Sequence, residues 1–563
     1  MKELVTILLL FFYSTIAFGQ QEMGFINSKQ GCKEQQIYVQ REIEISPVDN
    51  SKYLIGFFKD STEFNGTHLY TLSHIPHELS RGLFVIKLDS MDNFVWFKKL
   101  AESDSLNSIS IQCDFEGNII CGITYRSSLH VDGGVVANLG LTDCSLIKFN
   151  STGNIIFRKT IATTCFETIN DLCIDSSNNV YFTGNYGIDT NNGINNCPTN
   201  FDSTLLSGQI SYIAKVNKYG NYEWVNSYGV EIIQHISINN NALYCLGETS
   251  FTSNEIKGLF FDYNNVNYFS KCFVAKLNTQ GQGMWVKKFG SNDIQSAGIL
   301  NKSIITHNNR VYFTGLAASN SQNVFLFDGG PTLTGFNQVD YFIAAYDTSG
   351  NFKWNTISNS IGSEYIVDLY SDSSSNLYGV GKLNYTLRFP TDTLYSNGGD
   401  DVMVCSYDSM GNFRWAAQGG GWGADIGNGI AADTHGKLFI VGGTTSSPCF
   451  MGNDTLSPPA NQSTLFFSSL DSITLQVPDA MSNLSREQAH LITVPNPADQ
   501  EVVLQCNVSG EIYVYDAMGR CLFQQKTTTS PITLQTNSYP NGIYILHFRN
   551  KSSYTTQKIS IQH

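Results

Sequence analysis

The sequence predicts an all-β protein: a seven-bladed β-propeller in which strands from both chain ends share one blade, followed by a small C-terminal β-sandwich. One turn motif, Asp408-Ser-Met-Gly-Asn-Phe-Arg-Trp415, recurs with an aromatic residue three positions after the Asn. A strand that closes on Gly recurs at intervals of 61 to 68 residues. A period of about 60 residues holding four antiparallel strands is typical of a propeller blade, because radial packing covers both faces of each sheet.

The first residues have the features of a signal peptide. Lys2 precedes an apolar run from Leu4 to Ala17, and Ala17-Phe-Gly19 fits the small-x-small cleavage rule. The run of about 14 residues is short for a membrane span. No Cys follows Gly19 directly, so we do not expect a lipid-anchored lipoprotein. We predict a Sec signal peptide at residues 1–19, passage through the periplasm and no transmembrane span.

The repeats assign residues 20–476 to the propeller. The copies of the turn motif end at Trp96, Phe157, Trp224, Trp285, Trp354 and Trp415. Five of the six tryptophans thus share one position in the repeat, which predicts packing between blades, since each ring buries a large apolar area. The strand before each motif, such as Phe84 to Asp89, has the apolar alternation of a half-buried strand.

The two ends of the repeat region complement each other. A strand that closes at Gly56 precedes any Trp motif, whereas no Trp strand follows the last copy, Phe466 to Asp471. Strands from both ends are therefore expected to share one blade, which removes the open edges that a linear array would leave. A parallel β-solenoid is the structural alternative.

The Asp-x-x-Gly-Asn turns offer the oxygen ligands that calcium prefers. The same residues also suit a plain turn, because Asp or Asn caps the backbone and Gly tolerates positive φ. The turns lack the distal Glu of a full calcium loop. We predict no cofactor, with calcium as the alternative.

One region matches a known repeat. Trp415, Gly419-Gly-Gly, Asp425, Gly429-Ile-Ala-Ala-Asp433 and Gly436-Lys-Leu-Phe-Ile-Val-Gly442 resemble the bacterial SBBP-type β-propeller repeat. The resemblance extends over about residues 35–475. It implies a propeller fold and a secreted or surface setting, and it implies no reaction.

A polar linker at residues 477–490 leads to a different pattern at 491–563, where alternating strands and Asp/Gly turns predict a β-sandwich. Its spaced motifs contain Pro495, Asn496, Pro497, Gly519, Arg520, Gly542, Tyr544 and Lys558. They resemble the type A C-terminal sorting domain of the type IX secretion system of Bacteroidetes. The resemblance implies that this machinery is a partner and carries the protein across the outer membrane, often with removal of the domain and attachment to lipopolysaccharide.

Composition excludes one class of partner and leaves the cysteines open. A net charge of −14 opposes nucleic acid binding. Thirteen cysteines in an exported chain permit disulfides. Cys113 with Cys121 and Cys506 with Cys521 flank predicted turns, and buried free thiols are an equal alternative for both pairs.

The candidate ligand residues lie in two places. Trp422 is off the repeat phase in the stretch Gly419-Gly-Gly-Trp-Gly423, where a flexible backbone would present it to a ligand, unless it plugs the last blade. Polar residues just before the second Asp turn of each repeat are expected to line the axial channel: Asn170, Asp171, His235, Asp368 and Asn428. They form either a binding funnel or an acid/base set, or they are the solvated ends of inner strands.

Catalytic motifs are missing from the sequence. There is no Gly-x-Ser-x-Gly elbow, phosphate loop or dinucleotide fingerprint, and His74-Ile-Pro-His77 lacks the helix and the Glu of a zinc protease. We predict a monomeric, non-catalytic, secreted or cell-surface propeller that binds a protein or glycan. The alternatives are a glycan lyase or hydrolase with its site at the axial mouth, and a structural envelope component.

Overall fold

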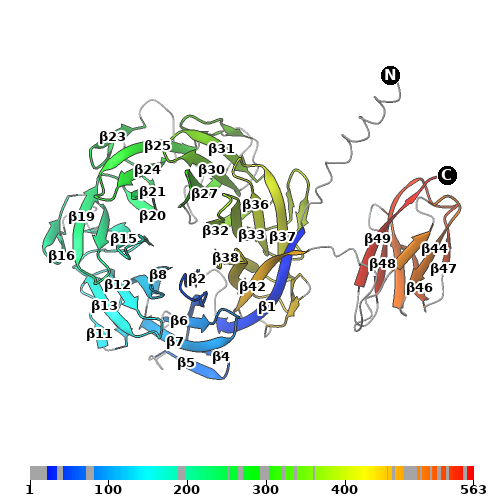
Figure 1. The fold of residues 1–563 in the computed structure, drawn as a ribbon, viewed down its shortest axis with the longest axis horizontal. Helices are drawn as coiled ribbons and strands as arrows, with labels where there is room; N and C mark the ends of the chain where they lie inside the picture. The colour runs from blue at the N-terminus through cyan, green and yellow to red at the C-terminus, as the bar shows by residue number, and fades with distance from the viewer. Residues whose placement is uncertain are drawn as a thin grey trace, which may run out of the picture. The chain divides into compact units, whose positions relative to one another are not determined.

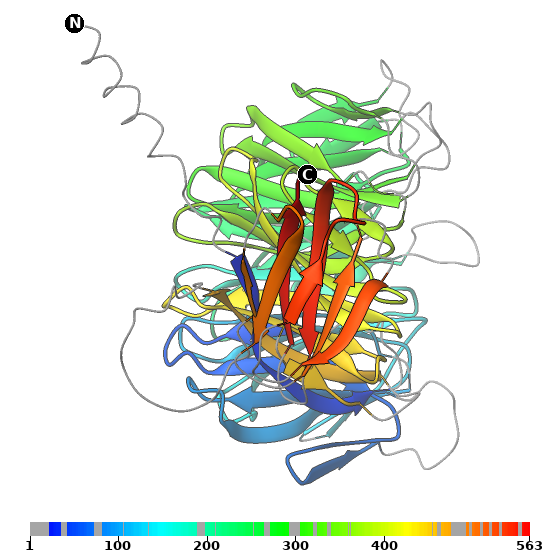
Figure 2. The same cartoon turned by 90° about the vertical axis from the view of Figure 1, so that its right-hand side faces the viewer.

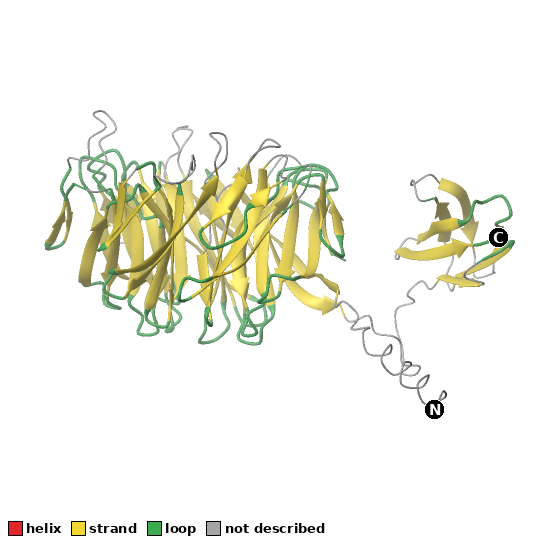
Figure 3. Ribbon diagram, turned by 90° about the horizontal axis from the view of Figure 1, so that it is seen from above, coloured by secondary structure: helices red, strands yellow, loops and turns green. Residues whose placement is uncertain are grey.

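The computed structural model describes most of the chain from residue 22 onward. The described residues are 22–34, 42–71, 81–104, 106–132, 134–187, 197–208, 210–251, 253–263, 271–291, 304–318, 324–334, 339–358, 360, 362–452, 454–458, 463–473, 491–494, 498–506, 510–516, 521–527, 532–549 and 554–563. The predicted signal peptide and linker lie outside them, as does the segment His74 to His77. The chain forms two compact units, Met1–Thr474 and Leu475–His563. The described residues form strands and turns without a helix (Figure 3), so the all-β prediction is confirmed.

The first unit consists of antiparallel sheets with an inner strand, two middle strands and an outer strand (Figure 1). In chain order, the first sheets are β2 (Glu42–Ile45), β3 (Lys52–Phe58), β6 (Arg81–Leu88) and β7 (Phe94–Ser103), with β10 (Leu129–Val131) and β11 (Gly134–Val136) at the edge; then β8 (Leu106–Cys113), β9 (Ile119–Tyr125), β12 (Asp143–Phe149) and β13 (Ile155–Ile161); and then β14 (Asp171–Ile174), β15 (Val180–Asn185), β18 (Ser211–Val216) and β19 (Tyr222–Tyr228). The next sheets are β20 (Ile232–Asn239), β21 (Ala242–Glu248), β24 (Cys272–Asn278) and β25 (Gly283–Ser291), with β28 (Val324–Phe327) and β29 (Leu333–Thr334) at the edge; and β26 (Ile304–His307), β27 (Arg310–Ala318), β30 (Val339–Asp347) and β31 (Phe352–Ile357). The last sheets are β32 (Tyr365–Ser371), β33 (Leu377–Leu383), β36 (Asp401–Tyr407) and β37 (Phe413–Gly421), with β40 (Cys449–Met451) and β41 (Asp454–Leu456) at the edge; and β38 (Asp425–Ala432), β39 (Leu438–Thr444), β42 (Ser463–Ile473) and β1 (Glu22–Glu34).

Short hairpins decorate this unit. They are β4 (Ser61–Phe64) with β5 (Thr67–Tyr70), β16 (Thr199–Phe201) with β17 (Thr204–Leu206), β22 (Ser253–Ile256) with β23 (Leu259–Asp262), and β34 (Thr386–Arg388) with β35 (Thr393–Tyr395).

The sheets follow one another around a common centre, with β2, β8, β20, β32 and β38 innermost (Figure 1). Middle strands are covered on both faces by the neighbouring sheets: every residue of β9, β12 and β36 is buried. The outer strand β13 instead alternates between half-buried and exposed residues. The expectation that the strand before each turn motif is half-buried is therefore wrong, and its near-continuous apolar content reflects burial on two faces.

The tryptophans of the repeat join successive sheets, as predicted. The indole Nε1 of Trp354 on β31 donates a hydrogen bond to the carbonyl of Ser409, 3.1 Å away, in the turn between β36 and β37 of the next sheet. Trp96, Trp224 and Trp285 make the same bond to the carbonyls of Ser151, Thr279 and Thr348. Each indole thus packs between its own outer strand and the motif turn of the next sheet along the chain.

The turn at Asp408 shows why the motif recurs. Asp408 Oδ1 accepts hydrogen bonds from the backbone N–H groups of Met410 and Asn412, and its Oδ2 accepts one from the Asn412 side chain. Gly411 has a φ of 85°. A Cβ at Gly411 would lie 2.5 Å from Cδ2 of Trp354, so this turn needs Gly for its backbone conformation and for close contact with the ring.

Replacement of Gly411 by Ala measures that contact when Gly436→Ala serves as the control. Gly436 has nearly the same φ, 84°, but no atom lies within 4 Å of a Cβ placed there. The control should lose about 1 kcal/mol through backbone strain, and Gly411→Ala should lose about 1–3 kcal/mol more through overpacking against Trp354. Urea unfolding of both variants checks this. If both variants lose the same free energy of unfolding, the close contact between Gly411 and the Trp354 indole does not contribute to the effect.

One disulfide is present among the described residues, between Cys165 and Cys197. It joins the segment before β14 to the segment before β16 and is not one of the pairs considered from the sequence. Cys113 and Cys121 are free thiols, so the alternative of unbonded cysteines holds for that pair. The side chains of Cys506 and Cys521 lie outside the described residues.

The second unit contains two antiparallel sheets (orange to red in Figure 2). Their strand orders are β43 (Leu491–Val494), β44 (Glu501–Cys506), β47 (Ile532–Gln535), and β46 (Cys521–Thr527), β45 (Gly510–Tyr515), β48 (Gly542–Arg549), β49 (Tyr554–Ile561). Val502 and Leu504 of the first sheet share one buried cluster with Ile512, Leu546 and Ile559 of the second. This unit therefore has a core of its own.

Candidate functional site

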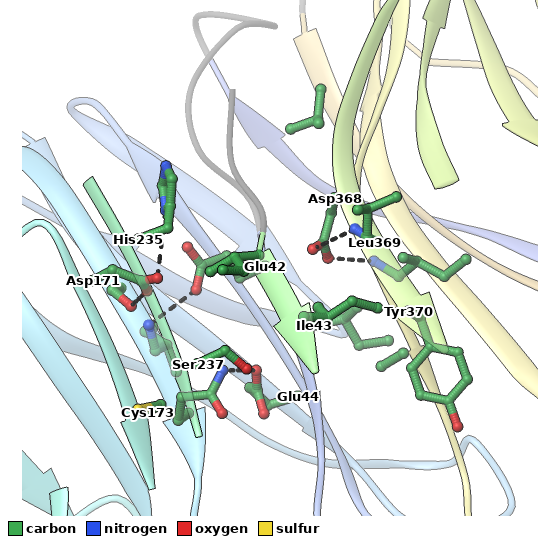
Figure 4. Close-up of a pocket in the computed structure, with 18 of the residues that line it drawn as sticks. Glu42, Ile43, Glu44, Asp171, Cys173, His235, Ser237, Asp368, Leu369 and Tyr370 are labelled. Carbon is green, nitrogen blue, oxygen red and sulfur yellow. Dashed lines mark hydrogen bonds and ion pairs between the residues drawn. The ribbon is translucent and has the colours of Figure 1, made fainter. Parts of the chain in front are cut away.

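The inner strands surround a cavity of about 880 Å³ at the centre of the first unit. Asp171, His235, Asp368 and Asn428 line it, as expected from the sequence. Figure 4 shows Asp171 and His235 on one wall and Asp368 on the other side of Glu42. The fifth predicted residue, Asn170, is not among the lining residues.

Asn170 is instead bound within the wall. Its amide nitrogen donates hydrogen bonds to Asn185 Oδ1 and to the carbonyl of Ile233, and its oxygen accepts one from the Thr168 hydroxyl. Both ends of the amide are therefore held by protein groups. Of the predicted channel residues, the structure brings Asp171 and His235 together, with 3.4 Å between Oδ2 and Nδ1.

The carboxylates of the cavity bind the edge of the neighbouring inner strand. Each inner strand leaves backbone N–H groups without a ladder partner, and these need an acceptor. Asp171 Oδ2 accepts the N–H of Ile236 on β20 at 3.0 Å. Asp368 Oδ2 accepts the N–H of Ile430 on β38 at 3.0 Å. Their carboxylates therefore join one sheet to the next, while both residues remain partly exposed at the cavity.

Glu42 and Glu44 do the same between β2 and β8 and were missed in the sequence. They accept the N–H groups of Ile111 and Cys113 at 3.0 and 3.1 Å. The signal was present as the alternation Glu-Ile-Glu-Ile in β2, which places both acids on one face. Burial raises the pKa of Glu44 well above its usual range, and the carboxylates of Glu42, Asp368 and Asp171 raise it further.

The cavity is therefore acidic. The described lining residues include these four carboxylates and no Lys or Arg. Among the part of the chain that the structure describes, no group of three or more His, Cys, Asp or Glu side chains is arranged to hold a metal ion. In the repeated turns the carboxylate oxygens accept hydrogen bonds from their own turn, as at Asp408.

Trp422 lies outside the cavity, between β37 and β38, and 85% of its surface is exposed. It is not a plug. Its neighbours are bound: the Gly421 N–H donates to Asp425 Oδ2, the Gly423 N–H to Ser446 Oγ and the Ala424 N–H to Thr445 Oγ1, each at 2.8 Å. The expectation of a flexible Gly-rich backbone is therefore wrong, because hydrogen bonds hold the turn on both sides of Trp422.

A buried pair of carboxylates lies beneath this turn. Asp401 and Asp425 are both fully buried. Asp401 Oδ2 accepts the N–H of Asn397 at 2.6 Å, and its Oδ1 has no hydrogen-bond partner among the described residues. A Cβ on Gly420 would lie 2.2 Å from Asp401 Oδ1 and 2.8 Å from Asp425 Oδ2, so oxygens of both carboxylates converge on this glycine.

Asp401 contributes to the stability of the first unit at low pH, and this contribution is lost as the pH rises. Burial raises the pKa of Asp401 to about 7; the Asn397 N–H opposes the shift, and the carboxylates of Asp425 and Asp400 add to it. An unfolded Asp titrates near about pH 4. Between these values the folded protein keeps a proton that the unfolded chain has lost, so the free energy of unfolding falls as the pH rises through this window.

Asp401→Asn removes this penalty because the amide is neutral at every pH. We expect a gain on the order of 2 kcal/mol at pH 8 and none at pH 4, since one pKa unit corresponds to about 1.4 kcal/mol. Thermal and urea unfolding at both pH values measure it. Asp408→Asn is the control, because hydrogen bonds from Asn412 and Met410 outweigh partial burial and lower the pKa of Asp408. An equal loss for Asp401→Asn at both pH values would contradict the prediction.

Part of the predicted sorting motifs lies among the described residues. Gly542 begins β48, and buried Tyr544 donates its hydroxyl to the carbonyl of Pro540 at 2.7 Å. Lys558 is opposite Ile545 in the β48–β49 ladder. Pro495, Asn496, Pro497, Gly519 and Arg520 lie outside the described residues.

Comparison with known families identifies the C-terminal region. Residues 494–562 match the family described as secretion system C-terminal sorting domain. The predicted sorting domain is confirmed, and it indicates export through type IX secretion to the cell surface or the medium. Within the described residues, helices long and apolar enough to cross a membrane were not found.

The remaining comparisons are with one relative and two solved structures. The chain is 21% identical over 439 residues to an uncharacterised WD repeat-containing protein of Acanthamoeba polyphaga mimivirus. The alignment covers 65% of this chain and only 31% of the length of that relative. A fungal alcohol oxidase of the AA5 family in complex with copper aligns with 96% of this chain and 100% of its own, at 9% identity and a TM-score of 0.36. A duf4221 family member from Bacteroides vulgatus aligns with 80% of this chain and 99% of its own, at 10% identity and a TM-score of 0.29. The WD repeat relative agrees with a propeller-like fold.

Proposed function

We propose that this protein is a non-catalytic, seven-bladed β-propeller of the SBBP type that is exported in a member of the Bacteroidetes and binds a protein or glycan through the surface at Trp422. A Sec signal peptide would carry it to the periplasm, and the sorting domain would carry it onward. The sorting machinery is its export partner, and its ligand is met outside the cell.

The arrangement of strands supports the propeller. Four-stranded antiparallel sheets repeat along the chain with their inner strands around one cavity. The N-terminal strand β1 pairs with β42 from Glu22 opposite Ile473 to Glu34 opposite Ser463. A strand from the start of the chain thus completes the sheet at the end of the repeats, which is how a closed ring avoids an open edge.

The contacts within the cavity favour binding over catalysis. A lyase or hydrolase needs a carboxylate or His that is free to exchange a proton with a substrate. Asp171 and Asp368 each hold the N–H of a neighbouring strand, and His235 is buried beside Asp171. These side chains already have a structural role at each junction.

The observation that carries the proposal is the exposure of Trp422 on a turn that hydrogen bonds hold in place. An exposed Trp on a soluble protein loses the benefit of burial, and a rigid ring costs little entropy when a partner covers it. Aromatic residues of this kind dominate the binding energy of many interfaces.

The test is a screen of the full-length protein on glycan and protein arrays, repeated with Trp422→Ala. We expect each specific ligand to bind the variant at least about tenfold more weakly, because loss of an anchoring Trp costs about 2 kcal/mol or more. Phe260→Ala is the matched control, since Phe260 is 76% exposed on the remote β22–β23 hairpin. Ligands that bind the Trp422 variant at full strength would refute this site.

A further inference from the structure

Three backbone segments meet around Trp422 and pack without side chains between them. A Cβ on Gly398 would lie 2.5 Å from the Trp422 Cα, one on Gly399 would lie 2.5 Å from the Gly423 carbonyl oxygen, and one on Gly421 would lie 2.3 Å from the Pro448 carbonyl oxygen. The segments 396–399, 418–424 and 445–450 are therefore in direct contact. This gives the ring a fixed base.

The surface that these segments form is free of charge. They contain Ser, Asn, Gly, Gln, Trp, Ala, Thr, Pro, Cys and Phe and no Lys, Arg, Asp or Glu. The acids that adjoin them, Asp400, Asp401 and Asp425, are buried. In a chain with a net charge of −14, such a neutral area next to an exposed Trp is a local departure from the average surface.

Further exposed aromatic rings belong to the same strand neighbourhood. Phe450, 47% exposed, pairs with Gly420 in the ladder between β40 and β37. Tyr395, 62% exposed, donates its backbone N–H to Gln418 Oε1 at 2.8 Å. Both residues therefore lie on strands next to the end of β37 that leads into Trp422.

Neutral polar groups accompany these rings. Asn397 and Ser447 are exposed in the segments that flank the turn. An amide offers both a donor and an acceptor, and a hydroxyl offers both as well. The combination of an apolar ring face with uncharged groups that donate and accept matches a sugar, whose C–H groups form an apolar face and whose hydroxyls project from the edge of the ring.

We infer that the Trp422 surface binds a neutral oligosaccharide, with a sugar ring stacked on the indole and its hydroxyl groups bonded to Asn397 and Ser447. The inference rests on the proposed function and commits it to one of its two ligand classes. A protein partner is less well matched, because protein interfaces usually have a rim of charged and polar groups that ask for complementary charges. Anionic glycans find no Lys or Arg in the three segments 396–399, 418–424 and 445–450.

Affinity electrophoresis of the full-length protein tests this inference. Gels contain a β-glucan, a xylan, a galactomannan or an α-glucan, and polygalacturonate serves as the anionic polysaccharide. We expect retardation by at least one neutral polysaccharide. Trp422→Ala should weaken it more than tenfold, Trp422→Phe should retain most of it, and Phe260→Ala should leave it unchanged.

A second readout comes from the indole itself. Acrylamide should quench Trp422 more readily than the other tryptophans because it is the most exposed, and the bound polysaccharide should protect it. Retardation by polygalacturonate alone, or by none of the polysaccharides, overturns the inference; if a protein from the array still requires Trp422, the proposed function stands without it. Neutral polysaccharide binding that persists in Trp422→Ala overturns both.

Discussion

Removal of residues 491–563 is expected to abolish the appearance of this protein on the cell surface and in the medium of a host that has type IX secretion. Residues 494–562 match the sorting domain family, and export by that route depends on the domain. The first unit should still fold, because the buried cluster of the second unit contains residues of that unit alone. Fractionation with an antibody against the first unit should find the truncated chain in the periplasm at close to full yield.

The reciprocal fusion is the control for this prediction. Residues 477–563 attached to an unrelated periplasmic protein should bring that protein to the surface. Normal surface display of the truncated chain would contradict the assignment, because another part of the molecule would then carry the export signal. Loss of the truncated chain by degradation is recognised by its absence from every fraction, and a protease-deficient host separates that result from failed export.

The repeat made the fold readable from the sequence. The Asp408 turn and the Trp at its end recur because each turn receives the indole of the preceding sheet, as Trp354 and Ser409 show. A local pattern that repeats for a packing reason can be recognised without knowledge of distant contacts. Burial on both faces of the middle strands was harder to see, because a short apolar run fits a half-buried strand or a fully buried one.

The candidate site was only partly readable for a different reason. Position in the repeat placed Asp171, His235 and Asp368 at the cavity. The carboxylates of Asp171 and Asp368, however, accept hydrogen bonds from backbone groups of another repeat, 65 and 62 residues away in the sequence. No sequence pattern marks such a partner. The rigidity of the Trp422 turn was missed for the same reason, since it comes from contacts with residues 398–399 and 445–448.

Deletion of residues 20–34 is the second large effect that we expect, and it tests the ring closure. This deletion removes β1, which supplies the outer strand of the sheet formed by β38, β39 and β42. The edge of β42 would then present unpaired N–H and C=O groups along Ser463–Ile473, which invites aggregation. We expect a thermal midpoint lower by about 10 °C or more and association of the purified chains, measured by calorimetry and light scattering.

Addition of the missing strand as a peptide decides whether strand pairing is the cause. A synthetic peptide of residues 22–34 should restore the thermal midpoint in a concentration-dependent manner, because a ligand that binds only the folded state stabilises it by mass action. A peptide of the same composition in scrambled order should not, since the observed register contains irregularities between Ile26 and Lys29 and between Gln30 and Lys33 that a different order would not reproduce. If the deleted chain unfolds at the same temperature as the full chain, β1 does not close the ring, and the proposed sharing of one blade between both ends is wrong.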